Sequence, residues 1–269
     1  MGKAAKSSKN ICSWKHDSSP NKSKIKPIDR VRFVAFIFPN REDRTRLARW
    51  VFRLSVIESS NGRLTPSVIV VQIDGMGTAW RSKAFHDVCY RNLKDAGFPE
   101  RIAWMKAAKE RITQMDLSRV GLYGGSAGGQ NAMGALLWHG DFYKVAVADC
   151  GCHDNRIDKI WWNEQWMGVP EGDIYARNSN AENARQLQGH LMLVVGELDR
   201  SVDPATTMQV AKQLVEMEKE FDLVVVPGAG HGACETPWAS RRRLKFFETH
   251  LTAVQSTDAG QHAVGVIKP

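Results

Sequence analysis

The hydrophobic pattern becomes regular from residue 68 onward, where short apolar runs alternate with longer amphipathic stretches. The first run, SVIVVQIDG, is apolar, rich in β-branched residues and ends in turn residues, a pattern typical of a strand buried on both faces of a sheet. Strands that alternate with helices of about 10–15 residues predict a parallel sheet with helices on both faces. The predicted strands are SVIVVQIDG, DLSRVGLYGG, YKVAVADCG, HLMLVVGELD and FDLVVVPGAG.

The stretches between these runs predict the helices, because their apolar residues recur at helical spacing. They are ERIAWMKAAKERI, SAGGQNAMGALLWHG, PATTMQVAKQLVEMEKE and SRRRLKFFETHL. On the third of these, one apolar face is expected, formed by Met208, Val210, Leu214 and Met217. Catalytic groups of such sheets lie at the carboxyl ends of the strands. We therefore expect the functional site near the strand ends at Asp74, Gly124, Asp149, Gly196 and Gly228.

The first 67 residues do not follow this pattern. Residues 1–63 contain 15 Lys and Arg against 5 Asp and Glu, whereas the rest of the chain is nearly balanced at 22 against 24. Their Lys, Ser, Asn and Pro content favours a partly disordered leader over a nucleic-acid-binding arm, because no aromatic residues suited to base stacking are interleaved. We expect a basic leader at 1–67, one α/β domain at 68–254 and a C-terminal tail at 255–269.

No apolar run approaches the roughly 20 residues needed to span a bilayer. The early apolar run VRFVAFIF lies too far from the start, and lacks the cleavage signal, for a secretory peptide. A cytoplasmic location is the resulting expectation. Five cysteines spread over 269 residues do not indicate a disulfide framework, so reduced thiols are expected.

The segment VGLYGGSAGGQNAMG surrounds one serine with small residues, between a predicted strand and a predicted helix. Its residues 124–128 fit the G-x-S-x-G motif in the context that the motif requires. Small flanking residues permit a strained turn that exposes the hydroxyl of Ser126 at the amino end of the helix. There the backbone N–H of Ala127 can stabilise an oxyanion, helped by the helix dipole. Taken alone, the motif would also suit a tight packing turn or a phosphate-binding loop.

A serine nucleophile needs a base, and the base needs an orienting acid. In hydrolases of this topology the three follow in the order Ser, Asp or Glu, His. Asp199 follows one late predicted strand, and His231 follows the next in a glycine-bounded loop. Asp203 competes with Asp199, but it precedes a proline and is predicted to cap the following helix. Glu197 is a weaker candidate.

The segment from about residue 68 to 252 resembles the catalytic domain of the prolyl oligopeptidase family of serine peptidases, nearest to the dipeptidyl peptidase IV branch. The resemblance implies an α/β-hydrolase fold with a mostly parallel, doubly wound sheet. It also implies that Ser126, Asp199 and His231 hydrolyse peptide bonds through an acyl-enzyme, without a metal or organic cofactor. The matching segments are VVQIDGMGTAWRSKAF, LSRVGLYGGSAGG, WWNEQWMGVP, VVGELDRSVDP and VVPGAGHG.

The same resemblance implies a substrate pocket. Trp162 matches an aromatic wall position, with Trp161 beside it and Val202 at the floor. Ordinary packing of a lid or helix explains the tryptophans equally well. Two departures weaken the expectation of a preference for proline. Ser201 stands where the branch often has an Asn that holds the substrate carbonyl, and Asp158 stands where another aromatic wall is usual.

In this family the catalytic domain usually follows a β-propeller. It also begins with strands and a Tyr-Gly-Gly-Pro segment, whose tyrosine supplies a second oxyanion donor. Here the first tyrosine is Tyr90, which already lies beyond the first matched strand. The resemblance therefore implies an N-terminally truncated or aberrant domain, without this donor unless Tyr90 or another group replaces it. The alternatives to a peptidase are an esterase or acyl hydrolase, and an impaired remnant that acts as a non-enzymatic scaffold.

The segment CGCHD at 150–154 contains metal-binding residue types but lacks the second ligand group that a zinc site needs at a distance, so no metal site is expected. The expected partner is a peptide substrate. No nucleic acid or membrane partner is expected, and a homo-oligomer stays an open alternative. The four residues considered as ligands are Cys150, Cys152, His153 and Asp154.

Overall fold

The computed structural model describes residues 31–37, 51–55, 68–79, 82–113 and 115–252. The tail expected at 255–269 lies outside these residues, and so does the expected basic leader apart from two strands within it. No helix in the described ranges is long and apolar enough to cross a bilayer.

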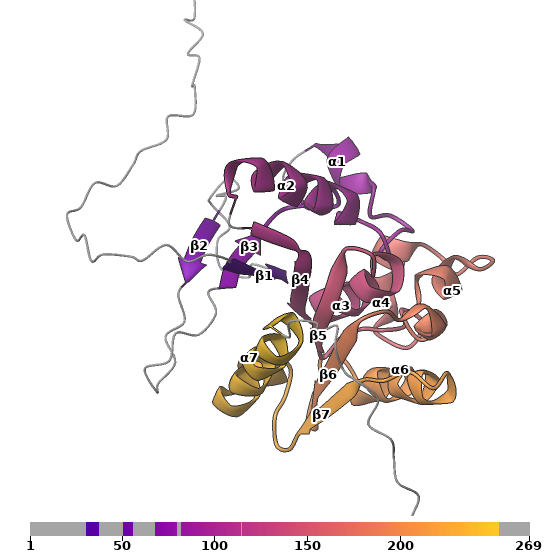
Figure 1. Cartoon of the computed structure of the whole chain (residues 1–269). Coiled ribbons are helices and arrows are strands. Elements are labelled where there is room, and N and C mark those ends of the chain that lie inside the picture. The colour runs from indigo at the N-terminus through magenta and orange to yellow at the C-terminus, as the bar shows by residue number, and fades with distance from the viewer. Residues whose placement is uncertain (1–30, 38–50, 56–67, 80–81, 114, 253–269) are drawn as a thin grey trace, which may run out of the picture.

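Seven strands form one sheet in the order β2-β3-β1-β4-β5-β6-β7 (Figure 1). Strand β2 pairs antiparallel with β3, and every other neighbouring pair is parallel. The predicted parallel sheet is therefore confirmed, with one antiparallel strand at its edge. The strands are β1 (Val31–Ile37), β2 (Val51–Ser55), β3 (Val68–Gln72), β4 (Met115–Gly125), β5 (Tyr143–Asp149), β6 (His190–Gly196) and β7 (Asp222–Val226).

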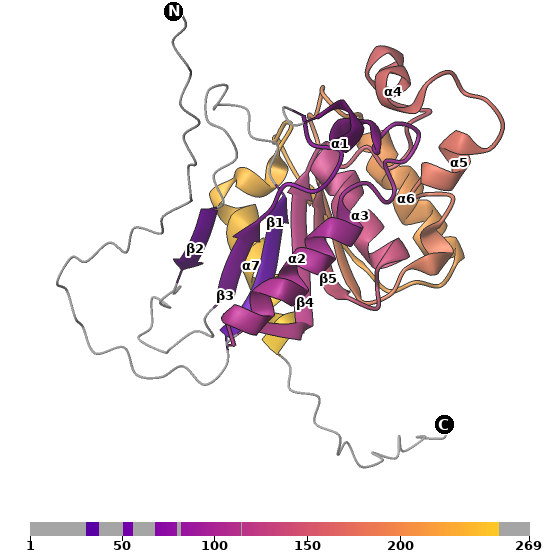
Figure 2. The same cartoon turned by 90° about the horizontal axis from the view of Figure 1, so that it is seen from above.

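Helices cover both faces of the sheet, as the alternation of elements predicts. Figure 2 shows α7 on the opposite side of the strands from α2 and α3. Successive residues of one strand point to opposite faces, so Leu122 packs in the layer of α3 whereas Tyr123 packs in the layer of α7. The helices are α1 (Lys83–Asp87), α2 (Phe98–Arg111), α3 (Ala127–Trp138), α4 (Ile160–Met167), α5 (Ile174–Asn178), α6 (Pro204–Glu216) and α7 (Pro237–Thr252).

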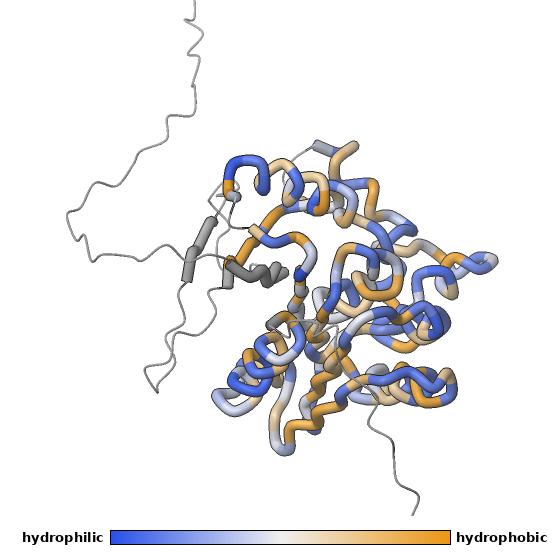
Figure 3. Tube along the Cα trace, viewed as in Figure 1, coloured by the Kyte–Doolittle hydropathy of each residue, from blue (hydrophilic) through white to orange (hydrophobic). Residues whose placement is uncertain are grey.

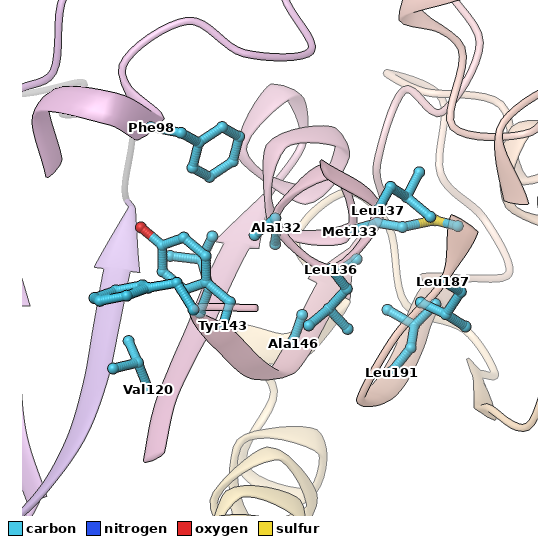
Figure 4. Packing of buried hydrophobic residues seen from close by; sticks show 14 of the residues in the cluster. Phe98, Val120, Ala132, Met133, Leu136, Leu137, Tyr143, Ala146, Leu187 and Leu191 are labelled. Carbon is cyan, nitrogen blue, oxygen red and sulfur yellow. The ribbon is translucent and has the colours of Figure 1, made fainter. Parts of the chain in front are cut away.

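The larger apolar layer lies between the sheet and helices α2, α3 and α6 (Figure 4). Leu136 of α3 is fully buried there, together with Val120 of β4 and Phe98 of α2. In Figure 3 strands β6 and β7 are largely hydrophobic, whereas the helices combine hydrophobic and hydrophilic positions. Burial of one leucine side chain contributes about 1.5–3 kcal/mol, so this layer holds the strands in place and fixes where their carboxyl ends meet.

One prediction about helix α6 is wrong in part. Val210 and Leu214 are buried as expected, but Met208 is 38% exposed and Met217 is 46% exposed. Met208 precedes Val210 by two residues, which is about 200° around an α-helix, so it lies on the opposite face. Met217 follows the last helical residue as the C-cap. The buried stripe is completed instead by smaller side chains, those of Thr206, Thr207 and Ala211.

Candidate active site

The three predicted catalytic residues follow three parallel strands that end at the same edge of the sheet. Ser126 comes directly after β4, Asp199 lies three residues after β6, and His231 lies five residues after β7. Strands β4, β5, β6 and β7 are neighbours in this order. The loops that carry the three side chains therefore emerge at the carboxyl edge of the strands, where open α/β sheets bind their ligands.

The backbone of Ser126 has the strained geometry of a nucleophile turn, with φ of 60° and ψ of −126°. Its N–H donates to the carbonyl of Asp149 at 2.9 Å, and its carbonyl accepts from the N–H of Gly129 at 2.8 Å. A Cβ atom on Gly124 would lie 2.1 Å from the carbonyl oxygen of Gly128. Only glycine permits this close approach, so the first glycine of the motif is required for the turn.

Asp199 and His231 form a hydrogen-bonded pair. Nδ1 of His231 lies 2.8 Å from Oδ2 of Asp199. The other carboxylate oxygen, Oδ1, accepts from the N–H of Ser201 at 2.8 Å and from that of Val202 at 3.0 Å. The Asp199 side chain is fully buried, whereas 28% of the His231 side chain is exposed. A buried, fixed carboxylate behind a partly exposed imidazole is the arrangement that orients a general base.

The two acids that competed with Asp199 have other contacts. Asp203 caps helix α6, accepting from the N–H of Ala205 at 2.9 Å, as its place before a proline predicts. Glu197 is exposed, and its carboxylate accepts from the N–H of Gly228 at 3.0 Å. Of these three acids, Asp199 is the one in contact with His231.

The thiol of Cys150 lies between the serine turn and the histidine loop. Its Sγ accepts from the N–H of Gly232 at 3.2 Å. Burial and the nearby charge of Asp149 together raise the pKa of this thiol to about 12, against the opposing effect of hydrogen bonds from the backbone N–H groups of Gly232 and Ser126. The thiol is therefore protonated at neutral pH. The backbone of Cys150 has a φ of 40°, which is uncommon for a residue other than glycine.

Among the described residues, Cys150, Asp199 and His231 also form a group whose potential metal-binding atoms lie within 4.8 Å of one another. Both oxygens of Asp199 already accept hydrogen bonds, so the group is better described as a paired acid and base beside a thiol. Two other residues of the CGCHD segment have partners outside this group. His153 is buried with Nδ1 3.0 Å from the side-chain nitrogen of Asn180, and Asp154 is paired with Arg156.

The sequence predicts one oxyanion donor, the N–H of Ala127, and leaves the source of the second open, with Tyr90 as one candidate. Ala127 is the first residue of α3, so its N–H is one of those that have no partner within the helix. Tyr90 is 50% exposed and lines a cavity of about 370 Å³ that is also lined by His86 and Trp166. The role of either residue as an oxyanion donor stays a prediction.

The predicted substrate-binding residues lie on α4 and on the loop after β6. Trp161 is 68% exposed, whereas Trp162 is partly buried, with its ring 6.5 Å from that of Trp166. The two elements are tied together because the Nζ of Lys159, at the start of α4, donates to the carbonyl of Ser201. The exposed Ser201 and the buried Val202 lie two and three residues after Asp199.

The sequence reasoning gave no role in the site to two residues that contact it, Cys150 and Asp149. Asp149 is only 1% exposed, yet it is an acid. Burial raises its pKa to about 6, opposed by the N–H of Cys234 and the thiol of Cys150. The sequence does place an acid at the end of an apolar strand, which is a signal for a functional residue. Its role could not be predicted, because the groups that it contacts belong to loops far away in the sequence.

A sequence model of the prolyl oligopeptidase family matches residues 63–253. Dipeptidyl peptidase 8 of Homo sapiens is 27% identical over 185 residues, which cover 67% of this chain and 20% of that protein. The chain therefore spans about a fifth of the length of this curated relative.

Two solved structures are similar to the fold. The dipeptidyl peptidase 4 of Porphyromonas gingivalis has a TM-score of 0.66 and 22% identity, covering 82% of this chain and 32% of that one. An acylaminoacyl peptidase has a TM-score of 0.69 and 16% identity, covering 88% of this chain and 40% of that one. These likenesses confirm the predicted α/β-hydrolase fold.

Proposed function

Because the chain belongs to the prolyl oligopeptidase family of serine peptidases, we propose that it hydrolyses peptide bonds with Ser126 as nucleophile, His231 as general base and Asp199 as the orienting acid. The contact between Asp199 and His231 carries the proposal. It joins a fully buried carboxylate to a partly exposed imidazole at the sheet edge where the strained turn of Ser126 also lies.

The proposed reaction begins when Nε2 of His231 takes the proton of the Ser126 hydroxyl and Oγ attacks the carbonyl carbon of the peptide. The tetrahedral oxyanion accepts a hydrogen bond from the N–H of Ala127. His231 then gives its proton to the leaving amine, and an acyl-serine is left. Water, deprotonated by the same imidazole, releases the acid and restores Ser126. Asp199 stays ionised and stabilises the imidazolium through Nδ1.

Substrates are proposed to lie between α4 and the loop after β6, against Trp161, Trp162, Ser201 and Val202. Support comes from the hydrogen bond of Lys159 to Ser201, which holds the two elements beside Asp199. The exposed indole of Trp161 offers a large apolar surface to a peptide. Substitution of Trp162 by Ala should raise KM more than it lowers kcat, because a wall residue binds the substrate and its transition state alike.

The experiment that tests the proposal is labelling of the purified chain with a fluorophosphonate, which reacts only with an activated serine. We expect labelling of the wild type and none of Ser126→Ala. Ser118→Ala is the matched control, because Ser118 is an exposed serine on β4, the strand that leads to Ser126. A folded wild type that stays unlabelled would overturn the proposal. Rates on matched amide and ester substrates then distinguish a peptidase from an esterase.

A further inference from the structure

Asp149, the last residue of β5, contacts two loops of the site at once. Its backbone carbonyl accepts from the N–H of Ser126 at 2.9 Å. Its side-chain Oδ2 accepts from the N–H of Cys234 at 3.1 Å. Cys234 belongs to the short helix η2 (Ala233–Glu235), which begins two residues after His231. A single residue therefore links the nucleophile turn to the loop of the base.

The burial of this carboxyl group is not explained by stability. Asp149 is 1% exposed, and within the described part of the chain its Oδ1 has no hydrogen-bond partner. An unsatisfied buried carboxylate oxygen is costly. An apolar side chain at the end of an apolar strand would avoid this cost. Buried polar groups that lack a partner in a native structure call for a functional explanation.

The groups around Asp149 come from four parts of the chain. The carboxyl faces the ionisable groups of η2, the His231 loop and the thiol that follows β5. Behind them, the hydroxyl of Tyr123 donates to Glu235 at 2.6 Å, and Arg243 of α7 pairs with the same carboxylate at 3.2 Å. The charge of Glu235 raises the pKa of Asp149, and that of His231 lowers it. The titratable and charged neighbours are Tyr123, Cys150, His231, Cys234, Glu235 and Arg243.

We propose that Asp149 is a positioning residue of the active site, whose carbonyl fixes the turn of Ser126 and whose ionised carboxylate holds the loop of His231 against it. The inference rests on the proposed function. A charged acceptor forms a hydrogen bond roughly twice as strong as a neutral one, so protonation of Asp149 in acid weakens the hold on η2. The carboxylate also adds a negative charge near the imidazolium that forms during the reaction.

Asp149→Asn tests this proposal, because it preserves the shape and one acceptor oxygen while it removes the charge. Asp141→Asn is the matched control, since Asp141 is an exposed aspartate just before the opposite end of the same strand. We expect kcat at pH 7.5 to fall by about 10- to 100-fold in Asp149→Asn with little change in KM. The wild-type pH profile of kcat should contain an ionisation of Asp149 near pH 6 in addition to that of the base His231, and Asp149→Asn should keep only the ionisation of His231. Normal kcat with an unchanged profile would overturn the proposal.

A second measurement does not depend on catalysis. Asp149→Ala removes the acceptor of the Cys234 N–H, so hydrogen–deuterium exchange should be about tenfold faster in peptides covering residues 231–236 than in the wild type and in Asp141→Asn. Equal protection of this segment would show that Asp149 does not hold the loop. If the wild type is not labelled by fluorophosphonate, the proposed function fails, and the exchange result still decides whether Asp149 has this role in the fold.

Discussion

The apolar layers of the sheet and its carboxyl edge are built in opposite ways. In the layer under α3, residues such as Leu122 and Leu136 are fully buried among apolar neighbours. At the carboxyl edge, Ser126 and Cys150 have positive φ angles of 60° and 40°, and Oδ1 of the buried Asp149 has no hydrogen-bond partner among the residues that the structure describes. Strain of this kind costs about 1–3 kcal/mol per residue. The comparison teaches that the layers supply the stability that lets a strained, polar edge persist.

Among substitutions at the carboxyl edge, Asp199→Asn should have the largest effect. The change keeps the size of the side chain but removes the charge that fixes the His231 tautomer. The reaction rate should therefore fall by about 10⁴ while substrate binding is nearly intact. Steady-state kinetics on a peptide amide substrate measure both quantities. Asp203→Asn is the control, and a comparable loss of rate in this variant would show that the wrong acid was assigned.

Among substitutions in the apolar layers, Leu136→Ala should have a large effect on stability. The variant leaves a cavity beneath α3, and the free energy of unfolding should fall by about 2–5 kcal/mol. Urea unfolding followed by circular dichroism measures the loss. Activity per folded molecule should stay close to that of the wild type, because the edge is held by several other buried side chains. A large drop in activity with unchanged stability would contradict the separation of the two regions.

A sharper test compares stability at two pH values. The pKa of Asp149 is raised to about 6 from its ordinary value of 3.8, so the folded state binds the proton more tightly. The resulting contribution to stability is complete below about pH 4 and is lost as the pH rises through about 6. Between pH 4.5 and 7.5 the wild type should lose about 2 kcal/mol in free energy of unfolding that Asp149→Asn does not lose. Parallel stability curves in urea would contradict the shifted pKa.

The smallest expected effect is that of Asp203→Ala. The loss of the hydrogen bond to the N–H of Ala205 removes the cap of α6, which should lower the free energy of unfolding by about 1 kcal/mol. Thermal unfolding measures the change. Fluorophosphonate labelling should continue at the wild-type rate, and a loss of labelling would mean that the cap also supports the site.

Much of the fold could be predicted from local patterns. Runs such as HLMLVVGELD form strands because an unbroken series of apolar residues suits a sheet that is covered on both faces. The position of β1 could not be predicted in this way, because its place between β3 and β4 depends on pairing with residues far along the chain. The exposed Met208 was mispredicted because hydrophobicity alone does not distinguish the faces of a helix when smaller residues complete its buried stripe.

The candidate site divides in the same way. Ser126, Asp199 and His231 could be placed at strand ends because motif and chain order are local properties, although their catalytic roles stay predictions. The contact of Asp149 with Cys234 joins residues 85 positions apart. No spacing rule reports such a contact, since it exists only once β5 and the loop after β7 have come together.

The order of the strands has a consequence for the newly made chain. Strands β4 to β7 each pair with their neighbour in sequence, so this half of the sheet can assemble progressively as it leaves the ribosome. Strand β1 is made first, yet one of its two partners is β4. Its residues must therefore stay unpaired on that side until β4 has been made. Pairing between strands so far apart in the sequence closes a long loop, and such steps are slow in folding.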